Sequence, residues 1–270
     1  MDRKNILKKV KNVVIKIGTQ VLIHENNRVD TSIIEHLGEQ IVWLISQGKR
    51  VVIVTSGAIG AGIQILGWKK RPEEIEKLQA AASVGQSRLM RLYERIFREE
   101  GYNVGQVLLT RDIFEIKERR EMAKLTLKTL LDNNIIPIIN ENDAIAVEEI
   151  KFGDNDYLSS LVVHLLNADC LILLTDVNGF YELDPKHNNN IEPVKEIIWN
   201  SQQMNKIKQV AKKGSPSLKG VGGMVSKVDA IDKVLRENKI CIIANGKKSW
   251  ILKDIFQKEN IGTLFLPGIK

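Results

Sequence analysis

Residues 51–62 form the stretch VVIVTSGAIGAG, in which a run of β-branched apolar residues passes through two hydroxyl residues into closely spaced glycines. Such a run is typical of a strand buried on both faces, and the small residues after it predict a tight turn into a helix. Glycine and Ser56 at a helix N-terminus expose amides that bind phosphate or carboxylate oxygens; a turn needed only for close packing is the alternative. Because position 59 is isoleucine, the stretch lacks the G-x-G-x-x-G spacing of a dinucleotide-binding turn.

Similar apolar runs recur along the chain and alternate with amphipathic stretches. Further strands are predicted at residues 13–17, 104–109, 135–139, 171–175 and 240–244. Helices are predicted at residues 31–47, 72–100, 118–133, 157–166, 224–237 and 249–256. Asp30 and Thr31 are both candidate caps for the first of these helices, and Gly48 marks its end. Residues 144–152 alternate as in a hairpin, and residues 184–193 are typical of a loop. This order of elements predicts an α/β fold with a mostly parallel sheet covered on both faces.

The composition predicts one compact globular domain over residues 1–270. Of these residues 43% are hydrophobic and 27% are charged, enough to bury a substantial core. No apolar run approaches the roughly 20 residues of a membrane helix, and no cleavage site precedes the first strand, so we expect a cytoplasmic protein. Cys170 and Cys241 begin apolar runs without a C-x-x-C partner, which predicts buried reduced thiols.

The net charge of +7 raises the possibility of a nucleic-acid partner. The basic residues are dispersed among acids, however, and only 5% of residues are aromatic, which leaves little for base stacking. We therefore expect a solvated surface with a modest attraction for an anionic substrate, and neither a nucleic acid nor a membrane as partner.

Polar residues follow four of the predicted strands, where ligands gather in open α/β sheets. The four strand ends are KIGT at 16–19, TSGA at 55–58, NEND at 140–143 and TD at 175–176. Together they offer a cation, hydroxyls, glycine backbone and carboxylates, which suit anions and metal-bound phosphate. Lys16 lies inside an apolar run, where its charge is costly without a charged partner, although its stem could instead snorkel over the sheet.

Two further stretches carry candidate chemistry. GDND at 153–156 opens a predicted helix, so capping and a polar or metal-associated role are both open. GVGGMVSK at 220–227 departs from P-loop spacing, but its glycines let amides approach phosphate and its lysine can neutralise the transferring group. A flexible surface loop is the alternative for this second stretch.

Five motifs together resemble the glutamate 5-kinases of the amino acid kinase family. They are KIGT, TSGAIGAG, NENDAIAVEEIKFGDND, LLTDVNGFY followed by DP, and GVGGMVSK, and the similarity runs from residue 11 to residue 266. The resemblance implies a three-layer αβα sandwich around a mainly parallel sheet of about eight strands. It implies an acceptor-binding half at about 1–168 and a nucleotide-binding half at about 169–270. It further implies ATP as donor with bound Mg²⁺, L-glutamate as acceptor in the first step of proline synthesis, inhibition by proline, and a homo-oligomer.

The resemblance also implies roles for individual residues. Lys16 and Lys227 would bracket the transferring phosphoryl group, and Asp156 would orient both lysines. The implied glutamate contacts are Ser56, Asp143 and Asn155, assisted by Asn140. The implied nucleotide contacts are Lys16, Thr175, Asp176, Val221, Gly222, Gly223, Met224, Val225, Ser226 and Lys227. Since Val221 and Val225 stand where relatives carry a threonine and a more polar residue, we expect backbone contacts there.

Other members of the family act on N-acetylglutamate, aspartate, carbamate or UMP, and a catalytically silent scaffold is a further alternative. NEND and GDND favour free glutamate because such polar residues suit an unblocked amino group, and the two lysines favour activity. Many relatives continue into a C-terminal PUA domain, an RNA-binding type of module, whereas this sequence stops after GTLFLPGIK. We therefore expect the functions of that module to be absent.

Overall fold

The computed structural model describes residues 2–24, 28–110, 112–145, 155–182, 191–213, 223–258 and 260–268. The strands are β1 (Asn12–Ile17), β2 (Arg50–Val54), β3 (Asn103–Leu109), β4 (Ile135–Glu141), β5 (Cys170–Thr175), β6 (Glu196–Ile198), β7 (Ile240–Asn245) and β8 (Thr263–Leu266). The helices are α1 (Arg3–Lys8), α2 (Thr19–Leu22), α3 (Thr31–Ser46), α4 (Ala58–Ile65), α5 (Ile75–Glu99), α6 (Asp112–Glu115), α7 (Lys117–Asp132), α9 (Asn155–Leu166), α10 (Ser201–Lys213), α11 (Met224–Arg236) and α12 (Ile251–Gln257).

The described strands form one sheet of eight, in the order β3-β4-β2-β1-β5-β7-β8-β6. The first six strands in this order are parallel to one another. β8 pairs antiparallel with β7, and β6 runs parallel to β8. The prediction of a mainly parallel sheet of about eight strands is therefore confirmed.

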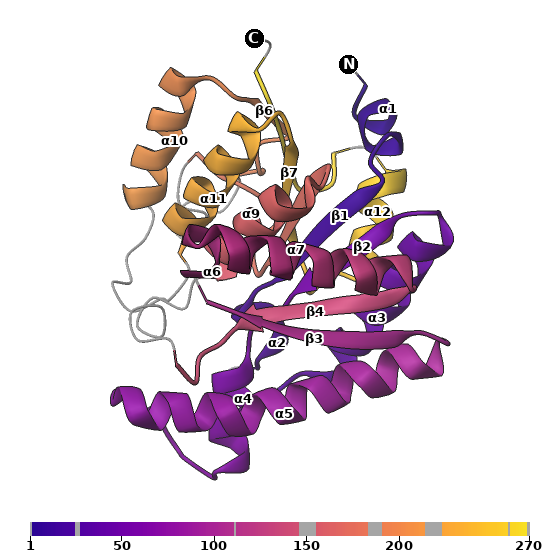
Figure 1. Ribbon diagram of the computed structural model, residues 1–270. Helices are drawn as coiled ribbons and strands as arrows, with labels where there is room; N and C mark the ends of the chain where they lie inside the picture. Colours follow the sequence, from indigo (N-terminus) through magenta and orange to yellow (C-terminus); the bar gives the residue numbers. More distant parts are fainter. Residues whose placement is uncertain are drawn as a thin grey trace.

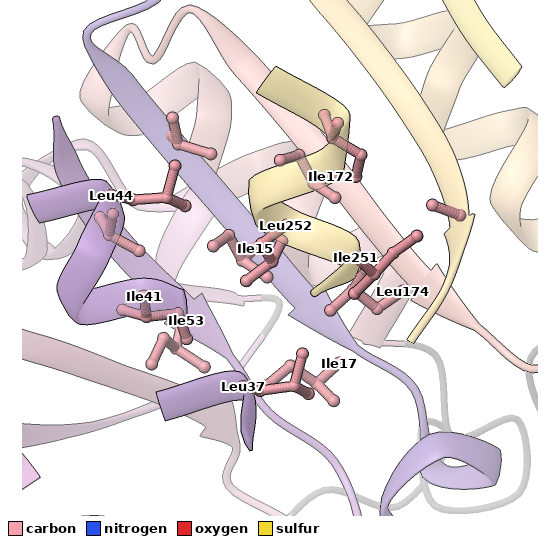
Figure 2. Close-up of a cluster of buried hydrophobic side chains, with 14 of the residues drawn as sticks. Ile15, Ile17, Leu37, Ile41, Leu44, Ile53, Ile172, Leu174, Ile251 and Leu252 are labelled. Atoms are coloured by element: carbon pink, nitrogen blue, oxygen red, sulfur yellow. The ribbon is translucent and has the colours of Figure 1, made fainter. Parts of the chain in front are cut away.

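Helices cover both faces of the sheet, as Figure 1 shows for α5 and α7 on either side of β3 and β4. Alternate residues of β1 serve the two layers, because successive side chains of a strand point to opposite faces. Ile15 and Ile17 join one core cluster with residues of α3, α5 and α12, and Figure 2 shows Ile15 near Leu252 of α12 and Ile17 near Leu37 of α3. Val14 joins a second cluster with α7, α9, α10 and α11. The expected three-layer αβα sandwich is thus confirmed.

The predicted elements appear near their expected bounds. α3 is capped by Asp30, whose side chain accepts a hydrogen bond from the amide of Ile33, and Gly48 follows its end with φ of 77°. α4 is the helix expected after the turn that follows β2. The helices α2, α6 and α10 and the strands β6 and β8 were not predicted; strands of three and four residues give little periodic signal. Residues 146–152 of the predicted hairpin and 184–190 of the predicted loop lie outside the described residues.

Both cysteines are buried free thiols, as predicted. Burial raises the pKa of the Cys241 thiol well above its ordinary value, which keeps it protonated. Across the described ranges no helix is both long enough and apolar enough to cross a membrane.

Two glycines bring α4 and α5 into backbone contact. A Cβ added at Gly62 would lie 1.7 Å from the carbonyl oxygen of Ala81, and one added at Gly85 would lie 1.8 Å from that of Ala58. Only glycine permits these approaches, so the close-packing explanation of the glycines in residues 51–62 holds for Gly62. The contact fixes α5 against the helix that follows β2.

Candidate active site

The predicted polar strand ends lie along one edge of the sheet. β4, β2, β1 and β5 are consecutive parallel neighbours, so their carboxyl ends point the same way. The structure places Lys16, Ser56, Asn140 and Thr175 in or directly after these four strands, and all four are buried. This edge is where a ligand is expected in an open α/β sheet.

Asp156, in the first turn of α9, lies between two lysines that come from distant parts of the chain. The ammonium of Lys16 on β1 is 2.6 Å from its Oδ1, and the ammonium of Lys227 on α11 is 3.0 Å from its Oδ2. Ser226 also contacts Oδ2 at 2.9 Å and the carbonyl oxygen of Gly223 at 2.8 Å. Asp156 thus supplies the charged partner that a lysine inside an apolar strand requires.

The two lysines determine the charge state of Asp156. Burial alone would raise the pKa of Asp156, but the ammonium groups of Lys16 and Lys227 lower it below its ordinary value. The carboxylate is therefore ionised at neutral pH, and one carboxylate faces two lysines. Because Lys16 and Lys227 are 5% and 6% exposed, their positive charges lie close together where solvent screens them weakly. A dianionic phosphoryl group is a suitable ligand for them.

A second group of polar side chains, all buried, surrounds the amide of Asn155. Its Nδ2 donates to the carbonyl oxygen of Thr55 at 2.8 Å, to Oγ of Ser56 at 3.1 Å and to Oδ1 of Asn140 at 3.0 Å. Oδ1 of Asn140 also accepts from the backbone amide of Glu141 at 2.9 Å. The structure therefore joins three of the four predicted glutamate contacts through one asparagine side chain.

Asp143, the fourth predicted glutamate contact, lies just beyond the end of β4. Burial raises its pKa to about 6, and the positive charge of Arg71 offsets this effect only in part. A carboxyl group whose charge is so poorly compensated is suited to a ligand that brings a cation.

Of the predicted nucleotide contacts, Thr175 and Asp176 lie at the end of β5, on the other side of β1 from β2 and β4. Thr175, at the end of β5, donates from Oγ1 to Oδ1 of the exposed Asp176 at 3.0 Å. Asn245, at the end of β7, donates to the carbonyl oxygen of Asp176 at 3.3 Å. Gly223 caps α11, and Met224, Val225, Ser226 and Lys227 form its first turn. Val221 and Gly222 lie outside the described residues, and their contacts with a nucleotide stay predictions.

A metal site was not predicted from the side chains. Within the ranges that the structure describes, no group of three or more His, Cys, Asp or Glu residues is placed to hold a metal ion. Asp156 already contacts two lysines. This donor set fits a magnesium ion that is carried by nucleotide phosphates, which is the usual mode for that metal in kinases.

Sequence reasoning missed three residues of this region. Gln86, in the middle of α5, has no strand-end signal, and only the fold brings it to Asn140. Asn245 does follow a predicted strand, so the rule used for the other strand ends could have found it. Arg71 lies in a loop between α4 and α5, and nothing local to it indicates that it approaches Asp143.

Comparison with solved structures identifies the class of fold. The carbamate kinase from Giardia lamblia bound to AMP-PNP superposes with a TM-score of 0.64 at 17% identity, covering 96% of this chain and 99% of the other. The UMP kinase from Bacillus anthracis gives a TM-score of 0.63 at 17% identity, covering 96% and 97%. The chain therefore has the fold of these small-molecule kinases.

Sequence comparison then gives the family. The profile of the amino acid kinase family matches residues 11–245, and the chain belongs to that family. The glutamate 5-kinase of Clostridium acetobutylicum is 44% identical over 268 residues, which span 99% of each chain. The glutamate 5-kinase of Geobacter sp. strain M21 is 44% identical over 266 residues, which span 98% of this chain and 70% of the relative. The resemblance predicted from the motifs is confirmed.

Proposed function

We propose that the chain transfers the γ-phosphoryl group of ATP to the γ-carboxylate of L-glutamate, giving L-glutamyl 5-phosphate, the first step of proline synthesis. The observation that carries the proposal is the contact of one buried carboxylate, Asp156, with both Lys16 and Lys227. Relatives that are 44% identical over nearly the whole chain and are named glutamate 5-kinase support the choice of acceptor.

The two lysines supply the electrostatic part of the reaction. Phosphoryl transfer asks a protein mainly for alignment and for positive charge where the phosphoryl oxygens become negative. Lys16 and Lys227 are held in place by Asp156, so little reorganisation is needed during the reaction. Mg²⁺ bound to ATP would neutralise further phosphate charge. The γ-carboxylate of the acceptor is already ionised at neutral pH, so no general base is required.

The residues around Asn155 and Asp143 form the proposed acceptor site. The amides of Asn140 and Asn155 and the hydroxyl of Ser56 can bind a polar, unblocked amino acid, and Asp143 can pair with its ammonium group. This set favours free glutamate over N-acetylglutamate, whose nitrogen carries no charge.

The nucleotide is assigned to the edge beyond β1. Thr175, Asp176 and the first turn of α11 from Gly223 would contact it, with Val221 and Gly222 completing the loop. Residues of about 1–168 then form the acceptor-binding half and those of about 169–270 the nucleotide-binding half. The proposal also includes a cytoplasmic location, a homo-oligomer, and inhibition by proline competing near Asp143.

Magnesium-dependent ADP formation tests the proposal, measured with L-glutamate, N-acetylglutamate, aspartate, carbamate or UMP. Hydroxylamine traps an acyl phosphate as a hydroxamate, which separates a carboxylate acceptor from a phosphate acceptor. We expect turnover and hydroxamate with glutamate. Turnover with a different acceptor alone would overturn the substrate, and no turnover with any of them would indicate a silent scaffold.

A further inference from the structure

Gln86 extends the acceptor site into the layer of helices. Its side chain is 9% exposed, and its Oε1 accepts a hydrogen bond from Nδ2 of Asn140 at 2.8 Å. Asn140 in turn accepts from Asn155. Gln86, Asn140 and Asn155 therefore form a continuous chain of three side-chain amides, which we call the amide relay.

A backbone amide determines which side-chain group donates and which accepts in each hydrogen bond of the amide relay. The amide N–H of Glu141 can bond only to an acceptor, so the atom of Asn140 that it contacts is oxygen. Nδ2 of Asn140 must then be the group that meets Gln86, and Gln86 must offer oxygen to it. The other amide atom of Gln86 is consequently the donor Nε2.

This donor has no hydrogen-bond partner among the described residues. A buried amide N–H₂ without a partner costs free energy unless a ligand or water satisfies it. Gln86 also lines a cavity of about 320 Å³, together with Ser83, Ser87, Glu141, Asn142 and Asp143. Besides Glu141, which also carries a carboxylate, the cavity thus combines two groups: the donor Nε2 of Gln86, which has no partner, and the carboxylate of Asp143, which has little compensating charge.

These two groups match the two charged substituents on the α-carbon of an amino acid. Asp143 suits the ammonium group, and no lysine or arginine is among the described residues that line the cavity. A carboxylate bound beside that ammonium must therefore take its hydrogen bonds from neutral donors. The γ-carboxylate belongs near Lys16 and Lys227, which leaves the α-carboxylate for this cavity.

We propose that Gln86 binds the α-carboxylate of the acceptor amino acid through Nε2 and is a specificity-determining residue of the site. This inference rests on the proposed function, because it assigns one carboxylate of glutamate to the lysines and the other to Gln86. The amide relay prevents Gln86 from turning its oxygen toward the ligand, so the site discriminates against acceptors without an α-carboxylate.

A change of acceptor preference in Gln86→Glu tests the inference. The acceptors are L-glutamate and L-isoglutamine, which keeps the γ-carboxylate but carries a carboxamide in place of the α-carboxylate. A Glu at position 86 still accepts from Asn140, but it presents a carboxylate oxygen where Nε2 was. This oxygen repels an α-carboxylate, whereas it can accept a hydrogen bond from the N–H of an α-carboxamide. We expect kcat/KM for glutamate to fall about 100-fold. The ratio of kcat/KM for isoglutamine to kcat/KM for glutamate should rise at least about 10-fold, and the KM for ATP should stay within about twofold of the wild-type value.

Matched variants separate binding from a general effect of charge or packing. Gln202→Glu places the same new charge on an exposed residue of α10 that does not line this cavity, and we expect it to leave the ratio of kcat/KM values for the two acceptors unchanged. If Gln86→Glu does not fold, Gln86→Met removes both the donor Nε2 and the oxygen that accepts from Asn140, without adding charge, and should lower the preference for glutamate by about tenfold.

Each outcome bears on one of the two proposals. An unchanged ratio in a folded Gln86 variant, with wild-type protein active on glutamate, overturns the role of Gln86 and leaves the proposed function in place. Equal kcat/KM values of wild-type protein for L-glutamate and L-isoglutamine would also overturn the role of Gln86 and leave the proposed function in place. Absence of glutamate-dependent hydroxamate with wild-type protein overturns the proposed function and, with it, the α-carboxylate assignment.

Discussion

Lys16 and Lys227 each contact a different oxygen of the same carboxylate, although one lies in the first strand and the other in a helix near the end of the chain. Asp156 therefore joins the proposed acceptor-binding half to the proposed nucleotide-binding half. The contact makes the position of either lysine depend on the other.

Replacing Lys227 tests the electrostatic role directly. We expect Lys227→Ala to lower kcat about 10²- to 10³-fold, as loss of one preorganised donor does elsewhere. Lys233→Ala is the matched control, because Lys233 lies on the same helix but is exposed and contacts the ring of Tyr157. Steady-state ADP formation at saturating glutamate measures both variants, and near-normal turnover in Lys227→Ala contradicts the role.

Removing the charge of Asp156 should cost stability as well as activity. Asp156→Asn leaves two buried ammonium groups without their carboxylate, and we expect the free energy of unfolding to fall by about 3 to 5 kcal/mol. The exposed pair of Arg50 and Asp132 supplies the control, Asp132→Asn, for which about 0 to 1 kcal/mol is expected. Urea denaturation measures the free energy of unfolding of both variants. Equal losses would contradict the larger contribution expected from the buried Asp156.

The pH dependence of stability follows from the same carboxylate. Folding lowers the pKa of Asp156, so its contribution is complete above the unfolded pKa of about 4 and is lost as the pH falls toward the folded pKa. We expect the difference in unfolding free energy between wild-type protein and Asp156→Asn to be constant from pH 8 to about pH 5. The difference should shrink below about pH 4.

Glutamate binding should depend on pH through Asp143. Its pKa of about 6 means that the carboxyl group is neutral below this pH and cannot pair with the ammonium of glutamate. Ligand binding favours the ionised form, so kcat/KM for glutamate should fall about tenfold per pH unit below pH 6. Asp143→Asn should have a lower kcat/KM and no such slope between pH 5 and pH 7. A slope that persists in that variant would assign the titration to another group.

The contact between α4 and α5 gives a prediction on packing. Gly85→Ala would place a Cβ 1.8 Å from the carbonyl oxygen of Ala58, so the two helices must separate. We expect a loss of at least about 2 kcal/mol in the free energy of unfolding and a raised KM for glutamate, because Gln86 and Ser56 flank this contact. Ala80→Ser adds one atom to the exposed side of the same helix and should change both values little. Thermal melting and glutamate titrations compare the two variants.

The sequence alone predicted the fold class and most of the strand-end residues for a simple physical reason. Long β-branched runs and amphipathic helices carry periodic signals, and polar residues directly after such runs must meet at one edge of a parallel sheet. Lys16 could be singled out because a cation inside an apolar strand needs a partner. Asp156 came from the family resemblance, and the structure shows how closely it contacts both lysines.

What could not be predicted depends on contacts between distant elements. In the sequence, nothing distinguishes Gln86 from other polar residues of a long helix. Its contact with Asn140 arises only in the fold, next to the glycine contact between α4 and α5. Arg71 approaches Asp143 only through the path of a loop. The short strands β6 and β8 are stabilised by pairing with the sheet edge, so their own residues carry little signal. The roles implied for Val221 and Gly222 stay predictions.

The backbone contact of Gly62 and Gly85 has a consequence for how this enzyme could change its substrate. In each helix a backbone carbonyl oxygen occupies the space that a side chain would need at the glycine of the other helix. We therefore expect α4 and α5 to move as one rigid body. The part of α5 that carries Gln86 then cannot shift to enlarge the acceptor cavity. New acceptors must then be accommodated by exchanging individual side chains at its surface. Directed evolution of acceptor preference should accumulate substitutions at positions such as 83, 86 and 87, while both glycines persist.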